Sequence, residues 1–151
     1  MCKTLNQKLI DIFNDANCFY ECAQMALGTK EDKSINVVNN LKIQMLKAPF
    51  CVNIAFACEL YLKMIMLKDG IEIPHLHKLD KLYNNLPQNR QEELRILFNI
   101  SEPAFLSSLK ASSDLFENYR YGFENNNLPK VHGMFMLNLA ENLHSICMTL
   151  S

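Results

Sequence analysis

The apolar run "FCVNIAFACELYLKMIMLKDG", residues 50 to 70, constrains the fold more than any other segment. Its apolar residues occupy nearly every side of a helix instead of one stripe, so neighbouring elements must cover most of its surface. Pro49 suits the first turn of a helix, and Gly70 suits the position that follows the last turn. The spacing therefore predicts a central helix from Pro49 to about Lys68, surrounded by other helices.

The central helix carries charges that argue against a membrane span. Its charge-free part runs only from Ala48 to Cys58, because Glu59 and Lys63 follow. A membrane-spanning helix needs ~20 mostly apolar residues. Aspartates also interrupt the N-terminal segment, where a signal peptide would have its apolar core. We therefore expect a soluble, cytoplasmic protein with no membrane partner.

The composition fits one globular domain over residues 1–151. Apolar residues make up 49% of the chain, which is enough to build a core. Four glycines and five prolines are few for a loop-rich or disordered protein. The formal net charge is −1, so no overall basic excess attracts nucleic acid. Six cysteines without a secretory signal are expected to be free thiols.

Helical periodicity extends over most of the remaining chain. Residues 29–47 show it only weakly and receive no assignment. Further helices are expected from Thr4 to Leu27, in "HLHKLDKLYNNLP" (75–87), in "QNRQEELRILFNI" (88–100), from about Ala104 to Asn125 and from Val131 to Leu150. Their inward stripes are Leu5, Leu9, Ile12, Ala16, Phe19, Ala23 and Leu27; Leu79, Leu82, Tyr83 and Leu86; Phe105, Leu109, Phe116, Tyr119 and Phe123; and Phe135, Leu139, Leu143, Ile146 and Leu150. The fold is therefore predicted to be all-α, an up-and-down helical bundle with four main helices plus one or two short ones.

The stretch "ENYRYGFENN", residues 117 to 126, places one arginine among aromatic rings. Arg120 lies at the edge of the apolar stripe, with Tyr121 beside it and Glu124 one turn later. A guanidinium that is partly removed from water needs a carboxylate, and the candidates are Glu124 and Glu59, which has Lys63 one turn later. Two interpretations stay open: an ion-pair network that joins two helices, or an arginine that contacts the phosphate or base of a ligand.

Three blocks together resemble the HEPN superfamily of small α-helical domains. They are "VNIAFACELYLKMIMLKDG", "HLHKLDKLYNNLP" and "FENYRYGFE", which match in order and spacing, over residues 52–124, its branches with E-L-x-L-K, H-x-L-x-x-L and R-Y-x-x-E blocks. The resemblance implies an up-and-down bundle, commonly a homodimer. It also implies kinship with metal-independent ribonucleases of defence or toxin–antitoxin systems. In those enzymes an R-x(4–6)-H motif supplies an arginine for the scissile phosphate and a histidine for acid–base work.

The chain departs from this pattern at the histidine. Asparagines occupy positions 125, 126 and 127, and His132 lies beyond Pro129. Asparagine cannot exchange a proton near neutral pH, so only Arg120 is carried over, as a contact to phosphate or RNA. We therefore expect a non-catalytic binding or interaction module, recognising RNA, a nucleotide or a protein partner, in a defence or toxin–antitoxin setting. The alternative is a metal-independent endoribonuclease in which Arg120 stabilises the phosphate and Glu59 or Glu124 replaces the histidine.

The other histidines and the cysteines offer weaker candidates. His77 matches the histidine at the start of a helix in the family blocks, where it caps or packs, and His75 precedes it without a carboxylate cluster to complete a metal site. Cys18 and Cys22 share one side of the first helix. A zinc site there would need Cys147 with His144, three residues apart. We expect instead that the two thiols are buried against a loop or a partner subunit, as small apolar groups. No metal and no cofactor are predicted.

Overall fold

The computed structural model describes residues 3–27, 40–114 and 133–150, with the side chains of residues 40–47 excepted. Within these ranges all regular structure is helical, and no strand occurs in them. The helices are α1 (Leu5–Leu27), α3 (Asn40–Lys68), α4 (Leu79–Asn84), α5 (Gln88–Ile96), α6 (Glu102–Ser112) and α8 (Gly133–Leu150). The predicted all-α bundle is confirmed.

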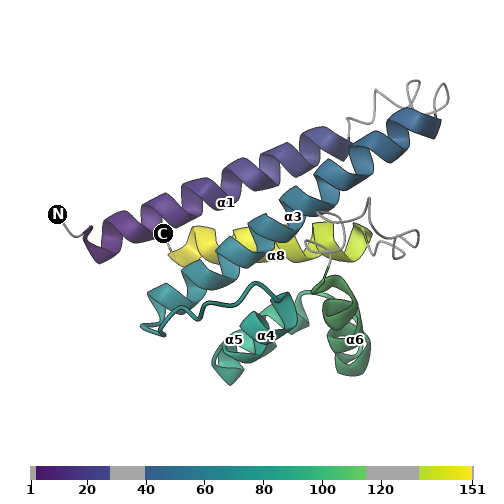
Figure 1. The fold of residues 1–151 in the computed structure, drawn as a ribbon. Coiled ribbons are helices and arrows are strands. Elements are labelled where there is room, and N and C mark those ends of the chain that lie inside the picture. Colours follow the sequence, from purple (N-terminus) through teal and green to yellow (C-terminus); the bar gives the residue numbers. More distant parts are fainter. Residues whose placement is uncertain (1–2, 28–39, 115–132, 151) are drawn as a thin grey trace.

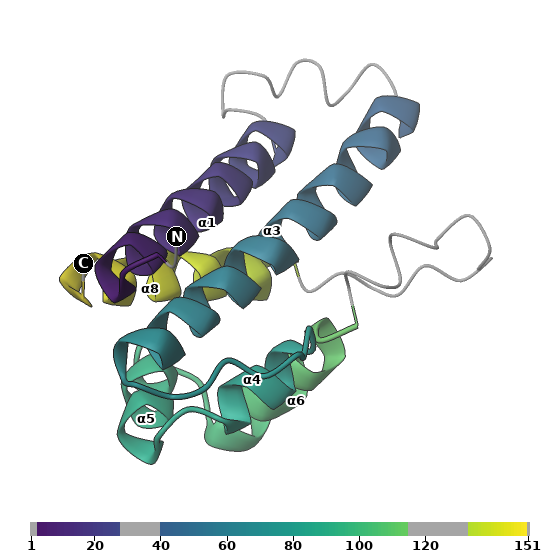
Figure 2. The same ribbon diagram turned by 60° about the vertical axis from the view of Figure 1, so that its left-hand side comes forward.

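Three long helices form the body of the bundle. Helices α1 and α3 lie side by side and run in opposite directions, and α8 packs against both (Figure 1). The shorter helices α4, α5 and α6 gather beside the C-terminal half of α3 (Figure 2). The start of α1 and the end of α8 lie at the same end of the bundle, where α3 also ends.

Helix α3 is the central element that its composition predicts. Its fully buried side chains face α1, α8 and α4, and they include Cys51, Ile54, Ala57, Cys58, Tyr61, Leu62 and Met66. The window Ala48–Lys68 is long and apolar enough to cross a membrane, with a mean hydropathy of 1.7, so length alone does not exclude a span. However, 67% of this window is buried inside the fold, as in the core helix of a bundle.

The end of α3 follows the prediction, and its beginning does not. Gly70 has a φ of +73°, the Ile71 N–H donates to the Met66 carbonyl at 2.8 Å, and the Gly70 N–H donates to the Leu67 carbonyl. These two hydrogen bonds form a Schellman motif, in which glycine is the favoured residue at the left-handed position.

The predicted start of α3 at Pro49 is wrong, because the helix begins at Asn40 and includes Pro49 in its interior. A proline costs an interior helix one hydrogen bond and a clash with the preceding turn. Packing of α3 against α1 outweighs that cost here. The carbonyl of Pro49 accepts a further hydrogen bond, from the Asn53 side-chain amide at 2.7 Å.

The predicted helix from Ala104 to Asn125 ends much earlier, at Ser112. Helix α6 begins after Ser101, whose hydroxyl accepts a hydrogen bond from the Ala104 N–H, as expected of an N-cap. At the other end, the Ser113 hydroxyl donates to the Leu109 carbonyl at 3.0 Å and accepts from the Asp80 N–H at 2.7 Å. These hydrogen bonds connect the end of α6 to α4. They end the helix at a point that the apolar stripe alone does not indicate.

The remaining stripes are largely confirmed. Leu79, Leu82, Tyr83 and Leu86 are buried, as are Phe105 and Leu109 of α6 and Leu139, Leu143 and Ile146 of α8. In α1, Leu9, Ala16 and Ala23 are buried, whereas Leu5 is 53% exposed because it belongs to the first turn, at the end of the bundle. Three residues of the predicted stripe after Leu109, namely Phe116, Tyr119 and Phe123, lie outside the described residues.

Candidate functional site

A buried carboxylate on α3 organises the candidate site. Glu59 is the charged residue that the apolar body of this helix buries, with only 5% of its surface exposed. Its Oε1 lies 2.6 Å from the Lys63 Nζ, and the same oxygen lies 3.0 Å from the Nδ1 of His77. We call Glu59, Lys63 and His77 the Glu59 cluster.

Two local features bring the cluster together. Lys63 lies one turn after Glu59, so the helix itself places the two side chains on one face. The Schellman turn at Gly70 ends α3, and the segment that follows runs back alongside the helix (Figure 2). This return brings His77 to a residue that precedes it by 18 positions.

Exposure changes steeply across the Glu59 cluster. The side chains of Glu59 and Lys63 are 7% and 13% exposed, whereas that of His77 is 65% exposed. The imidazole is therefore the part of the cluster that an outside molecule can reach. If its Nδ1 carries a proton and donates to Glu59, the second ring nitrogen, Nε2, is left as an acceptor. If both nitrogens are protonated, the ring is a cation, and its partner, the Glu59 carboxylate, is already paired with Lys63.

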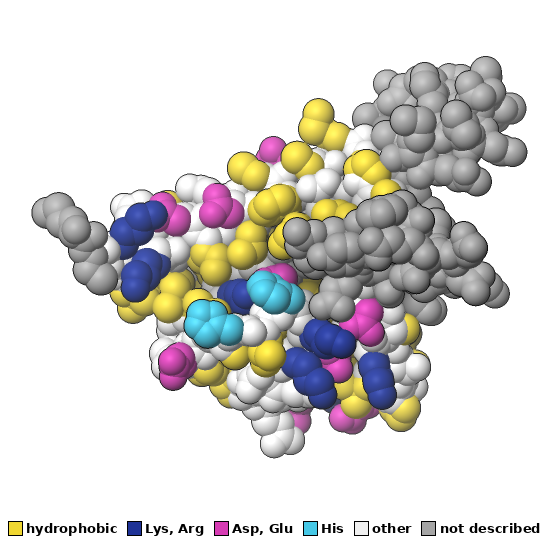
Figure 3. Space-filling model, in the orientation of Figure 1, with side chains coloured by type: hydrophobic (Ala, Val, Ile, Leu, Met, Phe, Trp, Pro, Cys, Tyr) yellow, Lys and Arg dark blue, Asp and Glu magenta, His cyan; other side chains and the backbone are white. Residues whose placement is uncertain are grey.

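Further polar groups continue from the cluster toward α4 and α6. Lys78 Nζ lies 2.9 Å from an oxygen of Asp114, and both side chains are about half exposed (48% each). His75 is also exposed. Figure 3 shows histidine, basic and acidic side chains together on the face that α3 shares with the short helices. The charges on this face are mixed, so any attraction for an anion there is local.

The structure places three of the six predicted site residues. It brings Glu59, Lys63 and His77 together. Of the two roles that the family blocks imply for His77, capping or packing, His77 does not cap α4. The N-cap position of α4 is Lys78, whose own side chain makes no capping hydrogen bond, and the Ser113 hydroxyl accepts from the Asp80 N–H in the first turn instead. The other three predicted residues, Arg120, Tyr121 and Glu124, lie outside the described residues. The i, i+4 spacing was enough to pair Lys63 with Glu59, but no local pattern signals the contact with His77.

The cysteine and histidine candidates for a metal site have other surroundings. Cys18 and Cys22 are exposed in the described part of the single chain, so no described element covers them, and burial against a partner subunit stays a prediction. Cys147 is buried, its thiol donates to the Tyr61 carbonyl at 3.6 Å, and burial raises its pKa to about 12. In the part of the chain that the structure describes, no three His, Cys, Asp or Glu side chains are grouped to hold a metal ion.

His144 lies among aromatic rings. Its imidazole stacks on Phe13 with ring centroids 5.8 Å apart and an interplanar angle of 14°. It also stacks on Tyr20, with centroids 5.9 Å apart at 25°, and it forms a T-shaped pair with Tyr61, with centroids 5.8 Å apart. Because Phe13 and Tyr20 both belong to α1, the imidazole of α8 fits between two rings of the neighbouring helix. This is a packing arrangement between helices.

Comparisons of the chain with protein-family models, with curated proteins and with solved structures gave no match in any of the three. The likeness to HEPN domains therefore depends on the three sequence blocks, and the all-helical fold agrees with it at the level of fold class.

Proposed function

We propose that the chain is a HEPN-like, non-catalytic binding module that holds a phosphate group of an RNA or a nucleotide beside the Glu59 cluster. The observation that carries the proposal is the single buried carboxylate shared by Lys63 and by an exposed His77. By family resemblance the module acts as a homodimer, in a defence or toxin–antitoxin setting.

The charges of the cluster support an anionic ligand. Glu59 is compensated by Lys63, so a protonated His77 adds one positive charge that faces outward. The sequence adds Arg120 as a second cationic contact, and a guanidinium with an imidazolium suits the oxygens of one phosphate. Since the whole chain has a net charge of −1, the attraction is local and involves one or two phosphates. The salt dependence of binding to single-stranded RNA should then be shallow, with a slope of roughly −1.

The cluster is better suited to holding a ligand than to cleaving one. Cleavage of RNA without a metal needs one group that removes a proton and another that donates one. Among the described residues, His77 is the exposed titratable group of the cluster, and the Oε1 of Glu59 already contacts both Lys63 and His77.

One distance favours a second candidate function, a metal-independent endoribonuclease. A carboxylate 3.0 Å from Nδ1 holds an imidazole in the tautomer whose Nε2 accepts a proton, as in hydrolase triads. In this alternative His77, rather than Glu59 or Glu124, is the general base, and Arg120 stabilises the phosphate.

Binding of fluorescently labelled single-stranded RNA and of nucleotides, measured by anisotropy in EDTA, tests the proposal. His77→Ala and Arg120→Ala should each weaken binding by about fivefold to tenfold, the loss of one charge-assisted contact. The matched control is His75→Ala, which removes an exposed histidine outside the cluster. A wild-type protein that binds neither RNA nor nucleotide would refute the proposal, and a protein partner would then become the remaining expectation.

The same samples separate binding from catalysis. Intact RNA after prolonged incubation in EDTA supports the binding module. RNA cleavage that is lost in His77→Ala and kept in His75→Ala would establish the endoribonuclease instead.

A further inference from the structure

A second site lies at the end of the bundle where three helices meet. The first turns of α1, the last turns of α3 and the last turn of α8 surround a pocket of about 300 Å³. None of its lining residues belongs to the Glu59 cluster. Its volume is at the lower end of the range of ~300–1,000 Å³ that is typical of ligand pockets, so it suits a small molecule.

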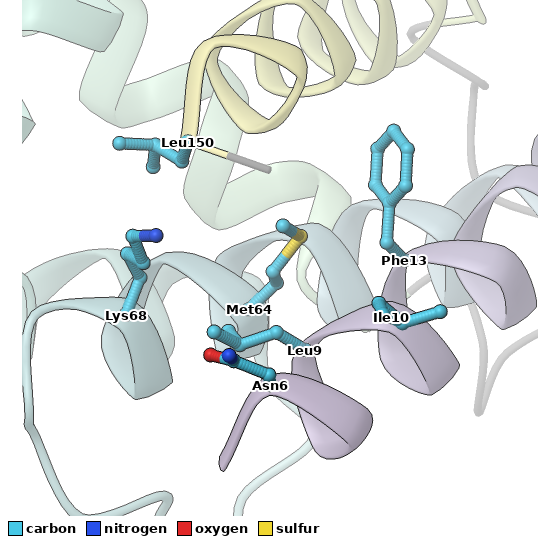
Figure 4. Close-up of a pocket in the computed structure, with 7 residues that line it drawn as sticks. All are labelled: Asn6, Leu9, Ile10, Phe13, Met64, Lys68 and Leu150. Carbon is cyan, nitrogen blue, oxygen red and sulfur yellow. The ribbon is translucent and has the colours of Figure 1, made fainter.

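The lining of the pocket is apolar inside and polar at one edge. Leu9 and Met64 form a buried floor, and Phe13 and Leu150, both half-buried, form the walls. Lys68 comes from the end of α3, and Figure 4 shows its side chain reaching from the ribbon into the space below Leu150. Such a pocket combines a place for an apolar chain with one cationic group.

Lys68 has no carboxylate partner among the residues that the structure describes. Lys8, Lys81 and Lys110 form no ion pair with the described residues either, and what sets Lys68 apart from them is its place in the lining of the pocket. Asn6, on the α1 side of the pocket, adds a side-chain amide that can donate a hydrogen bond. One ammonium group and one amide donor at the same edge suit a ligand that has an anionic end.

We propose that this pocket binds a medium-chain carboxylic acid. The alkyl chain lies between Leu9, Phe13 and Met64, where its burial replaces exposed apolar surface. The carboxylate lies at Lys68, with Asn6 as a second donor. A single unbranched chain fits the small volume better than a ring cofactor does, and one ammonium group matches one carboxylate.

Titration of decanoate, below its micelle concentration, into protein with ¹³C-methyl methionine tests the site by NMR. The Met64 methyl signal should shift saturably, because this side chain lines the pocket. The Met66 signal should not shift, since Met66 is equally buried on α3 but does not line the pocket. Each buried CH₂ is worth about fourfold in affinity, so decanoate should bind roughly 15-fold tighter than octanoate.

Variants test the role of the charge and of the pocket. Lys68→Met should weaken decanoate binding by about twofold to fivefold, the effect of one exposed ion pair. Lys8→Met, which changes an exposed lysine of α1 outside the pocket, should leave the affinity unchanged. Ile10→Trp fills the exposed edge of the pocket and should abolish binding, with circular dichroism to confirm that the variant folds.

Several results would overturn the proposal. They are the absence of a Met64 shift at millimolar decanoate, equal shifts of Met64 and Met66, and unchanged affinity in Lys68→Met. Decanol that binds as tightly as decanoate, or a folded Ile10→Trp variant that still binds, would overturn it as well.

Discussion

Replacing Lys63 by methionine should destabilise the protein far more than replacing an exposed lysine. The change leaves the Glu59 carboxylate, 7% exposed, without its closest cation at 2.6 Å. Removing one partner of a buried ion pair costs about 3–5 kcal/mol. Because His77 still contacts the same oxygen, we expect the lower end of that range, about 3 kcal/mol.

A variant with both charges removed tests whether the Glu59–Lys63 pair stabilises the fold or only offsets the cost of burying its two charges. Glu59→Leu alone leaves a lysine that can extend toward water, so it should cost less, about 1 kcal/mol. Glu59→Leu with Lys63→Met replaces both charges by apolar groups, and it should be within about 1 kcal/mol of the wild type. The double variant should therefore be more stable than Lys63→Met alone, a coupling that a double-mutant cycle measures.

Urea unfolding followed by far-UV circular dichroism provides the measurement. With a slope of about 2 kcal/mol per molar urea, Lys63→Met should lower the midpoint by about 1.5 M. The control Lys8→Met should stay within about 0.5 kcal/mol of the wild type. Two results would refute the view that Lys63 compensates the buried charge of Glu59. One is a loss of unfolding free energy in the double variant that equals the sum of the two single losses, and the other is a Lys63→Met protein as stable as the control.

Three further predictions follow from other parts of the structure. Iodoacetamide should label Cys18 and Cys22 in the native protein and spare Cys147, which peptide mapping by mass spectrometry can show. Burial raises the pKa of Cys147 from 9.0 to about 12, so the thiol of the unfolded chain loses its proton at a lower pH than the thiol of the folded chain. The contribution of this thiol to stability is therefore complete below about pH 9 and is lost toward about pH 12. Over that range the urea midpoint of the wild type should fall more steeply with pH than the urea midpoint of Cys147→Ala. Arg90 contacts both carboxylate oxygens of Asp69, at 2.9 and 3.0 Å, so Arg90→Lys should lose about 1 kcal/mol of unfolding free energy, whereas equal stability in urea would show that the paired geometry contributes nothing.

The sequence predicts the helices well where their ends depend on local chemistry. Gly70 ends α3 as expected, because a left-handed residue after the last turn is a local requirement. Pro49 misled the prediction, since its own preference for a first turn is weaker than the packing of α3 against α1. The end of α6 at Ser112 was missed because its stop depends on a hydrogen bond from Asp80, a residue of another helix.

In the candidate site, too, contacts between residues close in sequence are predictable and contacts set by the tertiary fold are not. Glu59 and Lys63 are four residues apart on one helix, so their pairing is readable from spacing. His77 reaches Glu59 only because the chain reverses after Gly70, and the length and path of that return are tertiary properties. The predicted role of Arg120 stays a prediction, because that residue lies outside the described part of the chain.

His144 of α8, stacked on two rings of α1, allows NMR to follow the contact between α1 and α8 without an added label. The His144 ring stacks on Phe13 and Tyr20, so the ring currents of both should move the NMR signals of the imidazole protons away from their ordinary frequencies. The exposed rings of His75 and His77 have no such neighbours among the described aromatic contacts. One displaced imidazole resonance thus becomes a native reporter: its return to an ordinary frequency during a titration would mark the moment at which the two helices part.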